Sequence, residues 1–195
     1  MAMRMQLNIS DDVTPFLTRL NAALSDRTGI NASIAVQEEE LFRTYVSAVS
    51  SRRHQTANRL GATPTGHLER ASQSIEGHGS ADGVTVSFPR STGLQRAFGD
   101  VVITPTRSKF ITIPVHAAAY GKRAREFGDL IALRVGSRGT LILARRLRGQ
   151  ETLETMYVLV KKVRQPQDRQ LLPDDKAILQ AAELGAKDYL GGLEA

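Results

Sequence analysis

The hydrophobic period of the chain changes from helical to strand-like after about residue 76 and back to helical at about residue 173, and these changes limit the folds open to it. Up to about residue 76 the apolar residues recur at helical spacing. From residue 83 to 165 the chain consists of short runs rich in β-branched residues, separated by Gly, Pro, Ser or Asp. Because helices and strands are segregated along the chain, the sequence predicts an α+β fold with a mainly antiparallel sheet of four to six strands.

Two helices are predicted before the strands and one after them. The first follows Ser10 and two aspartates, which favour the positive end of the helix dipole. The second starts after Asn31 and reaches Arg53, with glutamates early and arginines late, and we expect it to be the longest helix and to support the sheet. A short helical piece is predicted at 67–75, and Asp174 or Asp175 is expected to cap a C-terminal helix.

Six runs have the alternation and composition of strands. They are residues 84–88, 100–105, 109–115, 129–136, 140–147 and 156–163. The stretch "VGSRGT" between two of them predicts a hairpin turn, and Pro114 indicates an edge strand or a strand end.

Length and composition predict a single globular domain, mainly helical over 1–76, mainly strand over 83–165, with a C-terminal helix at 173–191. The apolar fraction of 41% and the charged fraction of 24% are ordinary for a globular chain. No apolar run approaches the roughly 18 residues that a spanning helix needs. The N-terminus has no signal-peptide pattern, so we expect neither secretion nor a membrane partner.

The sequence carries none of the common signatures of catalysis. It has no G-x-S-x-G elbow, no P-loop, no G-x-G-x-x-G and no H-E-x-x-H. There is no cysteine, and the histidines at 54, 67, 78 and 116 lack the spacing that puts two metal ligands on one helix face. Acid pairs such as Asp174 and Asp175 stand at predicted helix starts, where capping is their usual role. We therefore expect no enzymatic activity, no cofactor and no metal site.

Positive charge is concentrated in the second half of the chain. Residues 107–169 hold 14 Lys or Arg against 5 Asp or Glu, a local charge of +9, whereas the remainder holds 12 against 15, or −3. Such a surface attracts nucleic acid, an acidic protein face or an anionic membrane. Aromatic residues make up only 5% and do not interleave with the basic runs, which argues against a base-stacking platform but leaves loose contact with DNA open. The basic residues expected to form the functional surface are Arg107, Lys109, Lys122, Arg123, Arg125, Arg145, Arg146 and Arg148.

The densest part of this charge follows a predicted strand directly. In "KFITIPVHAAAYGKRAREF" the strand gives way to a small-residue turn in which Gly121 permits the change of direction. Lys122, Arg123 and Arg125 come next. One interpretation is a solvated basic loop; the other is a loop that projects from a rigid sheet into a neighbouring subunit or a channel.

Several stretches together resemble a known family. These are "RRHQTANRLGATPTGHLERA", "ITPTRSKFITIPVHAAAYGKRAREFGDL", "YVLVKKV" and "LLPDDKAILQAA". The residues of these stretches and their order along the chain resemble those of the virion morphogenesis, or tail completion, proteins of Mu-like tailed bacteriophages and prophages. The likeness covers most of the chain from about residue 10 to 190, and residues 77–98 have no assigned role in it.

The resemblance implies a non-catalytic structural protein of the virion, assembled in the cytoplasm of a host bacterium. Relatives of this kind form rings, usually of six copies, at the head-proximal end of the tail, and their partners are the tail tube protein and the head-tail connector. In such a ring the basic surface would face acidic partner surfaces or lie near the phage DNA. The competing hypothesis from the charge pattern is a DNA-binding accessory protein of a phage or prophage.

Overall fold

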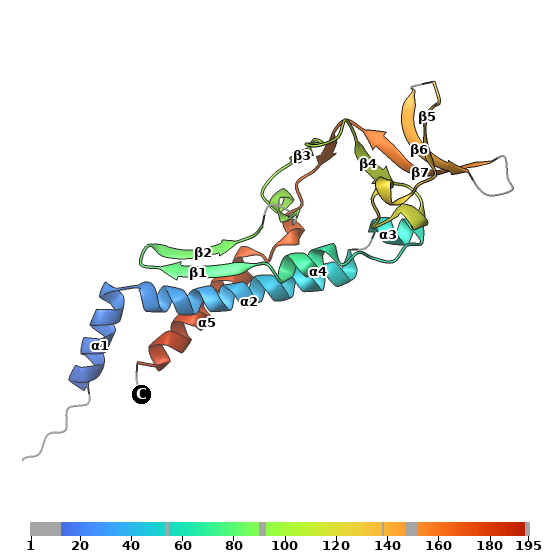
Figure 1. Cartoon of the computed structure of the whole chain (residues 1–195). Helices are drawn as coiled ribbons and strands as arrows, with labels where there is room; N and C mark the ends of the chain where they lie inside the picture. Colours follow the sequence, from blue (N-terminus) through green and yellow to red (C-terminus); the bar gives the residue numbers. More distant parts are fainter. Residues whose placement is uncertain (1–12, 54, 90–92, 138, 147–151, 194–195) are drawn as a thin grey trace, which may run out of the picture. The chain divides into compact units, whose positions relative to one another are not determined.

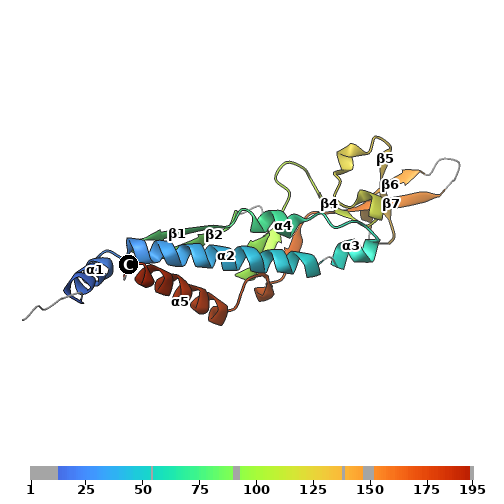
Figure 2. The same cartoon turned by 90° about the horizontal axis from the view of Figure 1, so that it is seen from below.

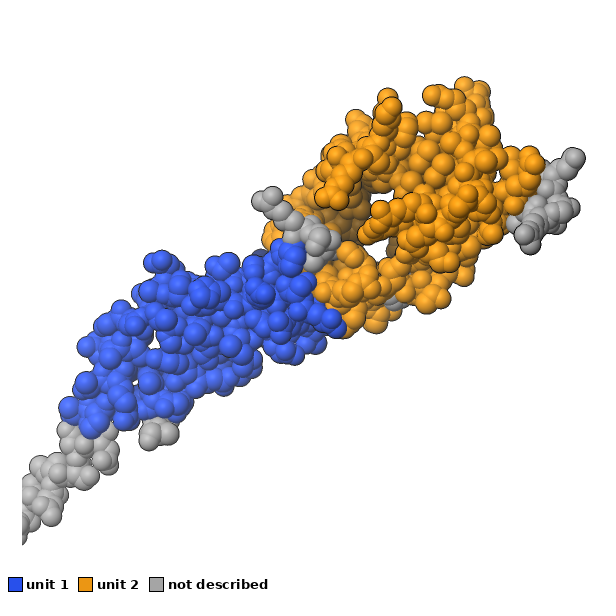
Figure 3. Space-filling view, viewed as in Figure 1, with its two compact units in different colours: residues 1–45, 73–89, 173–195 blue, residues 46–72, 90–172 orange. Residues whose placement is uncertain are grey.

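The computed structural model describes residues 13–53, 55–89, 93–137, 139–146 and 152–193 (Figure 1; Figure 2). The chain forms two compact units, one of residues 1–45, 73–89 and 173–195 and one of residues 46–72 and 90–172 (Figure 3). Below they are called unit 1 and unit 2. Because each unit combines separate segments of the chain, neither corresponds to one continuous stretch of sequence. The expectation of a single domain stays a prediction.

Unit 1 contains the three predicted helices, with α2 shared between the units. They are α1 (Val13–Ser25), residues 28–45 of α2 (Thr28–Arg52) and α5 (Asp175–Gly191). The helix α2 begins earlier than predicted because the Asp26 carboxylate accepts a hydrogen bond from the Thr28 backbone N–H at 3.0 Å. Asp174 is the N-cap of α5, accepting from the Ala177 N–H at 2.8 Å. The predicted cap of α1 at Ser10 to Asp12 lies outside the described residues.

In unit 1, α2 and α5 approach each other closely at a small residue. A Cβ on Gly185 would lie 2.6 Å from the Cα of Ile34, a distance that real Cβ atoms do not show. The Ser33 hydroxyl donates to the Gly185 carbonyl at 2.8 Å, which holds the two backbones together. The helix pair is therefore fixed by backbone proximity as much as by apolar side chains.

A β-hairpin packs along the opposite side of α2 within unit 1 (Figure 2). It consists of β1 (Glu76–Ser80) and β2 (Gly83–Ser87), paired antiparallel. Gly77 and Gly79 let β1 touch the helix backbone: a Cβ on Gly79 would lie 2.3 Å from the carbonyl carbon of Asn31. Residues 77–80 of β1 and all of β2 lie in the stretch 77–98, for which the sequence indicated no role.

Unit 2 is built on a four-stranded antiparallel sheet with the order β4-β7-β6-β5. Its strands are β4 (Ile111–Pro114), β5 (Leu130–Val135), β6 (Thr140–Arg146) and β7 (Leu153–Val160), and β3 (Val101–Ile103) pairs with β8 (Val163–Gln165). The unit also holds α3 (Gln55–Leu60), α4 (His67–Ser72) and 3-10 turns at Leu94–Ala97, Ala117–Ala119, Ala124–Glu126 and Arg169–Leu171.

These elements confirm the α+β class, the antiparallel sheet of four strands, the long helix in the N-terminal half and the C-terminal helix. Pro114 is the last residue of the edge strand β4, where its missing N–H costs no ladder bond. No helix in the described part of the chain combines the length and the apolar composition that crossing a membrane requires.

Candidate functional site

The predicted basic loop is anchored to the core of unit 2. We call residues 121–127 the basic loop. Ala124 and Phe127 pack against a buried cluster of Ala119, Met156 and Tyr157, while Lys122, Arg123 and Arg125 are exposed. Gly121 begins the loop with φ +77°, a left-handed conformation that glycine adopts without steric cost. The loop thus alternates between apolar anchors and outward-facing cations.

Tyr157 fixes the backbone before and inside this loop. Its side chain is 1% exposed, and its hydroxyl lies 3.2 Å from the Ala119 carbonyl oxygen and 3.0 Å from that of Lys122. Burial raises the pKa of Tyr157, and the nearby charge of Glu126 raises it further, so the hydroxyl remains a donor at neutral pH. One buried side chain therefore ties the loop to strand β7.

Two further contacts hold the loop in shape. The Glu126 carboxylate accepts a hydrogen bond from the Arg123 backbone N–H at 3.0 Å. The Lys122 ammonium lies 5.6 Å from the centre of the Phe127 ring, within range of a cation–π interaction. Among the described residues, no acidic side chain forms an ion pair with Lys122, Arg123 or Arg125. The loop is pinned by its backbone and its apolar side chains, and its guanidinium groups are left for other molecules.

The strand register shows which of the other predicted residues lie near this loop. Arg145 pairs with Leu130 on β5 and Glu154 on β7, so the C-terminal end of β6 lies at the end of the sheet where β4 finishes and the basic loop begins. Arg146 is exposed there. Arg145, in contrast, forms an ion pair with Asp129, Nε to Oδ2 at 2.6 Å, and so contributes less free charge than its neighbours.

His116 and Glu154 add a polar pair at the same end of the sheet. The ring nitrogen Nδ1 of His116 accepts from the Ala118 backbone N–H at 3.2 Å, and Nε2 lies 2.9 Å from Glu154 Oε1. This arrangement assigns the Nε2–H tautomer, with the proton donated to Glu154. The pair supports the turn between β4 and the basic loop.

Arg107 and Lys109 lie at the opposite end of the sheet. Both precede Ile111, which pairs with Val160, the last residue of β7. Lys161 and Lys162 follow that residue and are exposed, as are Arg107 and Lys109. The expected surface is therefore two groups of cations at opposite ends of the sheet, and the second includes two lysines that the sequence reasoning left out. Arg148 lies outside the described residues.

A charged cluster elsewhere in unit 2 has a structural role. Asp168 accepts from Arg53 and, at 2.8 Å, from Arg96. Burial by itself would raise the pKa of Asp168, but the hydrogen bonds and charges of the two arginines lower it below its ordinary value. The cluster joins the residue after α2 to the 3-10 turn at Leu94–Ala97. In the part of the chain that the structure describes, no three His, Asp or Glu side chains gather as a metal site requires.

No protein-family model, no characterised protein and no solved structure matches the chain.

Proposed function

We propose that the chain is a structural, non-catalytic protein of a tailed bacteriophage or prophage. It completes the tail and joins it to the head by forming a ring at the head-proximal end of the tail. The sequence support is the resemblance described above, which extends over most of the chain. The structural observation that carries the proposal is the basic loop: exposed guanidinium groups on a backbone that Tyr157 ties to the core.

A loop of this kind suits a surface for protein assembly. Because its backbone is already ordered, binding costs little additional conformational entropy, and preorganisation of this kind raises affinity. Exposed arginines make bidentate hydrogen bonds to carboxylates, and arginine is enriched at protein–protein interfaces. The partners that fit are acidic faces of the tail tube protein, the head-tail connector or an adjacent copy in the ring.

A charge-reversal variant tests the proposal. Lys122, Arg123 and Arg125 are all changed to Glu, which takes the net charge from +6 to 0 through three changes of two units each. The matched control changes Arg19, Lys176 and Lys187 to Glu, an equal charge change on exposed residues of unit 1. In the phage that carries the gene, the loop variant is expected to accumulate heads and tails that do not join, whereas the control forms infectious particles. Normal infectious particles from the loop variant would contradict the proposal.

A DNA-binding accessory protein is the second candidate, and the other end of the sheet favours it. Arg107, Lys109, Lys161 and Lys162 are exposed there, and no described acidic residue forms an ion pair with them. Fluorescence anisotropy with duplex DNA at about 50 mM and 200 mM salt separates the two functions. A phosphate binder loses affinity steeply between these concentrations, by about a thousandfold or more for six phosphate contacts. Micromolar or tighter binding at the higher salt would favour the DNA-binding function.

A further inference from the structure

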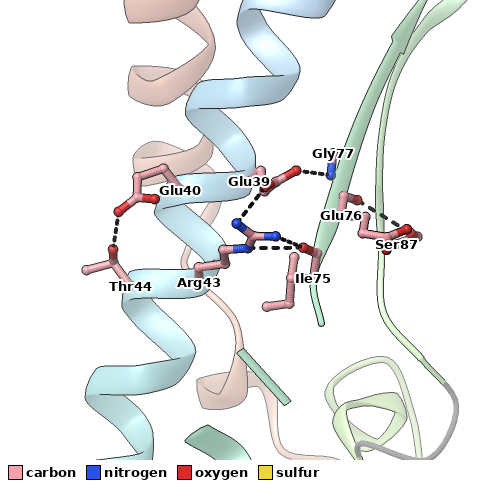
Figure 4. Close-up of polar contacts among 8 residues, drawn as sticks. All are labelled: Glu39, Glu40, Arg43, Thr44, Ile75, Glu76, Gly77 and Ser87. Atoms are coloured by element: carbon pink, nitrogen blue, oxygen red, sulfur yellow. Dashed lines mark hydrogen bonds and ion pairs between the residues drawn. The ribbon is translucent and has the colours of Figure 1, made fainter. Parts of the chain in front are cut away.

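The two edges of the hairpin in unit 1 differ in how their backbone groups are satisfied. The outer edge of β1 is closed by side chains of α2 (Figure 4). The Glu39 carboxylate accepts from the Gly77 N–H at 2.7 Å, and Arg43 donates to the Ile75 carbonyl at 2.9 and 3.1 Å. Glu39 and Arg43 also pair with each other at 2.9 Å. No further strand can be added at this edge.

The outer edge of β2 has backbone groups that point away from β1. The Gly77 N–H is directed at Glu39, so Gly77 and Val86 form a non-hydrogen-bonded pair of the hairpin ladder. Because hydrogen-bonded and non-hydrogen-bonded pairs alternate along an antiparallel ladder, Gly79 and Val84 form the next non-hydrogen-bonded pair. The N–H and C=O groups of Val84 and Val86 therefore point out of the hairpin. Among the described residues, no strand pairs with this edge and no backbone group bonds to Val84 or Val86 across it.

The two faces of the hairpin determine the kind of strand that fits this edge. Val84 and Val86 share a face with Gly77 and Gly79, which touch α2, and both valines are partly buried. Thr85 and Ser87 are exposed on the other face. An added strand must alternate in the same way, with apolar residues on the helix side and polar residues outside.

The N-terminal segment of the chain has this alternation. Residues 3–9 read M-R-M-Q-L-N-I, with apolar residues at every odd position and polar residues at every even one. Strict alternation over seven residues is the pattern of a half-buried strand. These residues lie outside the described part of the chain.

We propose that residues 3–9 of one copy add as a third strand to the outer edge of β2 in a neighbouring copy. This inference rests on the proposed function, because it names the contact through which copies join in the ring. A contact between two different surfaces, the N-terminal strand and the β2 edge, is heterologous, and a heterologous contact can close into a ring. Main-chain hydrogen bonds to a sheet edge supply affinity, and the alternating side chains supply specificity.

The length of α1 favours a neighbouring copy over the same chain. The tip of the hairpin lies beside the N-terminal end of α2, since Asn31 Nδ2 donates to the Ser80 carbonyl at 2.6 Å. In both cartoon views α1 extends beyond that end of α2, away from the hairpin (Figure 1; Figure 2). Its 13 residues span about 20 Å, whereas the four Cα–Cα steps from Val13 back to Ile9 reach at most about 14 Å. Its own β2 edge is out of reach of residues 3–9.

Disulfide trapping tests this contact cleanly, because the chain has no cysteine. Single-cysteine variants at Met3, Met5, Leu7 and Ile9 are each mixed with Val86→Cys carrying a distinguishable tag, and the mixtures are oxidised. At least one mixture is expected to give a mixed dimer at twice 21.3 kDa on a non-reducing gel. The matched controls are cysteines at Arg4, Gln6 and Asn8, whose side chains face the other side of the strand and should cross-link at least tenfold less. Absence of any mixed dimer overturns the proposal, as does a cross-link that forms only within one chain carrying both cysteines.

A proline variant supplies an independent readout. Val86→Pro removes an N–H that points outward, so the hairpin ladder is kept while the edge is blocked. The control Val86→Thr keeps the N–H. Here the copy that supplies the β2 edge carries Val84→Cys together with one of the two Val86 changes, and the other copy carries an N-terminal cysteine. We expect Val86→Pro to reduce the yield of mixed dimer at least tenfold and Val86→Thr to leave it unchanged. Equal yields with the two variants would overturn the proposal. The two proposals can fail separately. If the mixed dimer forms but the charge reversal of the basic loop leaves virions normal, only the proposed tail function is contradicted. If virion formation depends on the basic loop but no mixed dimer forms, only the strand contact is contradicted.

Discussion

The two units of the molecule are held together in different ways. In unit 1 glycines bring backbones into direct contact, at Gly185 between α5 and α2 and at Gly79 between β1 and α2. In unit 2 a large buried side chain, Tyr157, connects the sheet to a loop whose cationic side chains form no ion pair among the described residues. The contrast indicates that unit 1 tolerates little change at its contacts, whereas unit 2 separates its packing residues from its exposed ones. Four variants test that comparison, from the largest expected effect on stability to the smallest.

Gly185→Ala is expected to have the largest effect. The added methyl group would meet the Ile34 Cα at 2.6 Å and the Ser33 carbonyl oxygen at 2.8 Å, and both are backbone atoms that cannot rotate away. Overpacking of this kind costs about 3 kcal/mol of unfolding free energy. The control is Gly191→Ala in the same helix, where no atom lies within 4 Å of the added Cβ. Urea denaturation measures the unfolding free energy of each variant, and equal values in the two variants would contradict the close approach of α5 to α2 at Gly185.

Tyr157→Phe is expected to cost about 1.5 kcal/mol, because it removes the hydroxyl that bonds to the Ala119 and Lys122 carbonyls and leaves the volume unchanged. The effect should depend on pH. Since the folded-state pKa of Tyr157 is raised above its unfolded value of about 10, its contribution is present below pH 10 and is lost as the pH rises through the folded-state pKa. Chemical denaturation of both proteins between pH 8 and 11 measures this, and a stability difference that stays constant over that range would contradict the assignment.

Asp168→Asn is expected to cost about 1 kcal/mol at neutral pH, since it removes a partly exposed charge that pairs with Arg53 and Arg96. Because the folded-state pKa of Asp168 is lowered, its contribution is present above its unfolded pKa of about 4 and is lost as the pH falls through the folded-state pKa. The stability difference from the unchanged protein should therefore shrink at low pH. Thermal melts at pH 7 and pH 3 give the comparison; a difference that grows in acid would rule out this ion pair.

The triple reversal of Lys122, Arg123 and Arg125 is expected to change the unfolding free energy by no more than about 0.5 kcal/mol, because these side chains are exposed. The same melts measure it, with the unit 1 reversal of Arg19, Lys176 and Lys187 as the reference. A loss of several kcal/mol confined to the loop variant would show that the cations stabilise unit 2, and any failure of tail joining would then reflect misfolding.

Much of unit 2 could be predicted from the sequence, because its local patterns agree with its structure. All five alternating runs that lie in unit 2 contain strands, and Pro114 and Gly121 stand where an edge strand ends and a turn begins. What the sequence could not show is which cations share an end of the sheet. That depends on register, which places Arg107 and Lys109 with Lys161 and away from the basic loop.

The hairpin of unit 1 shows the opposite case. The strand β1 reads E-G-H-G-S, with no β-branched residue, and glycine usually weakens a strand. It is extended because Gly77 and Gly79 allow contact with α2, where Glu39 accepts from the Gly77 N–H. Such a strand is specified by a partner distant in sequence, so no local pattern predicts it. The helix α3 was missed for another reason: its six residues are too few to show a helical period, and α4, which is equally short, was predicted only within a longer piece at 67–75.

The most direct test of the account is the mass of the protein alone and on tails. Native mass spectrometry or light scattering gives the mass of the purified 21.3 kDa chain, and scanning microscopy of purified tail tubes incubated with it gives the number of copies bound at one end. Self-assembly at the tail predicts several copies in a closed ring at the head-proximal end, lost when Val86→Pro blocks the β2 edge. A chain that stays monomeric in solution and binds the tail as a single copy would contradict it.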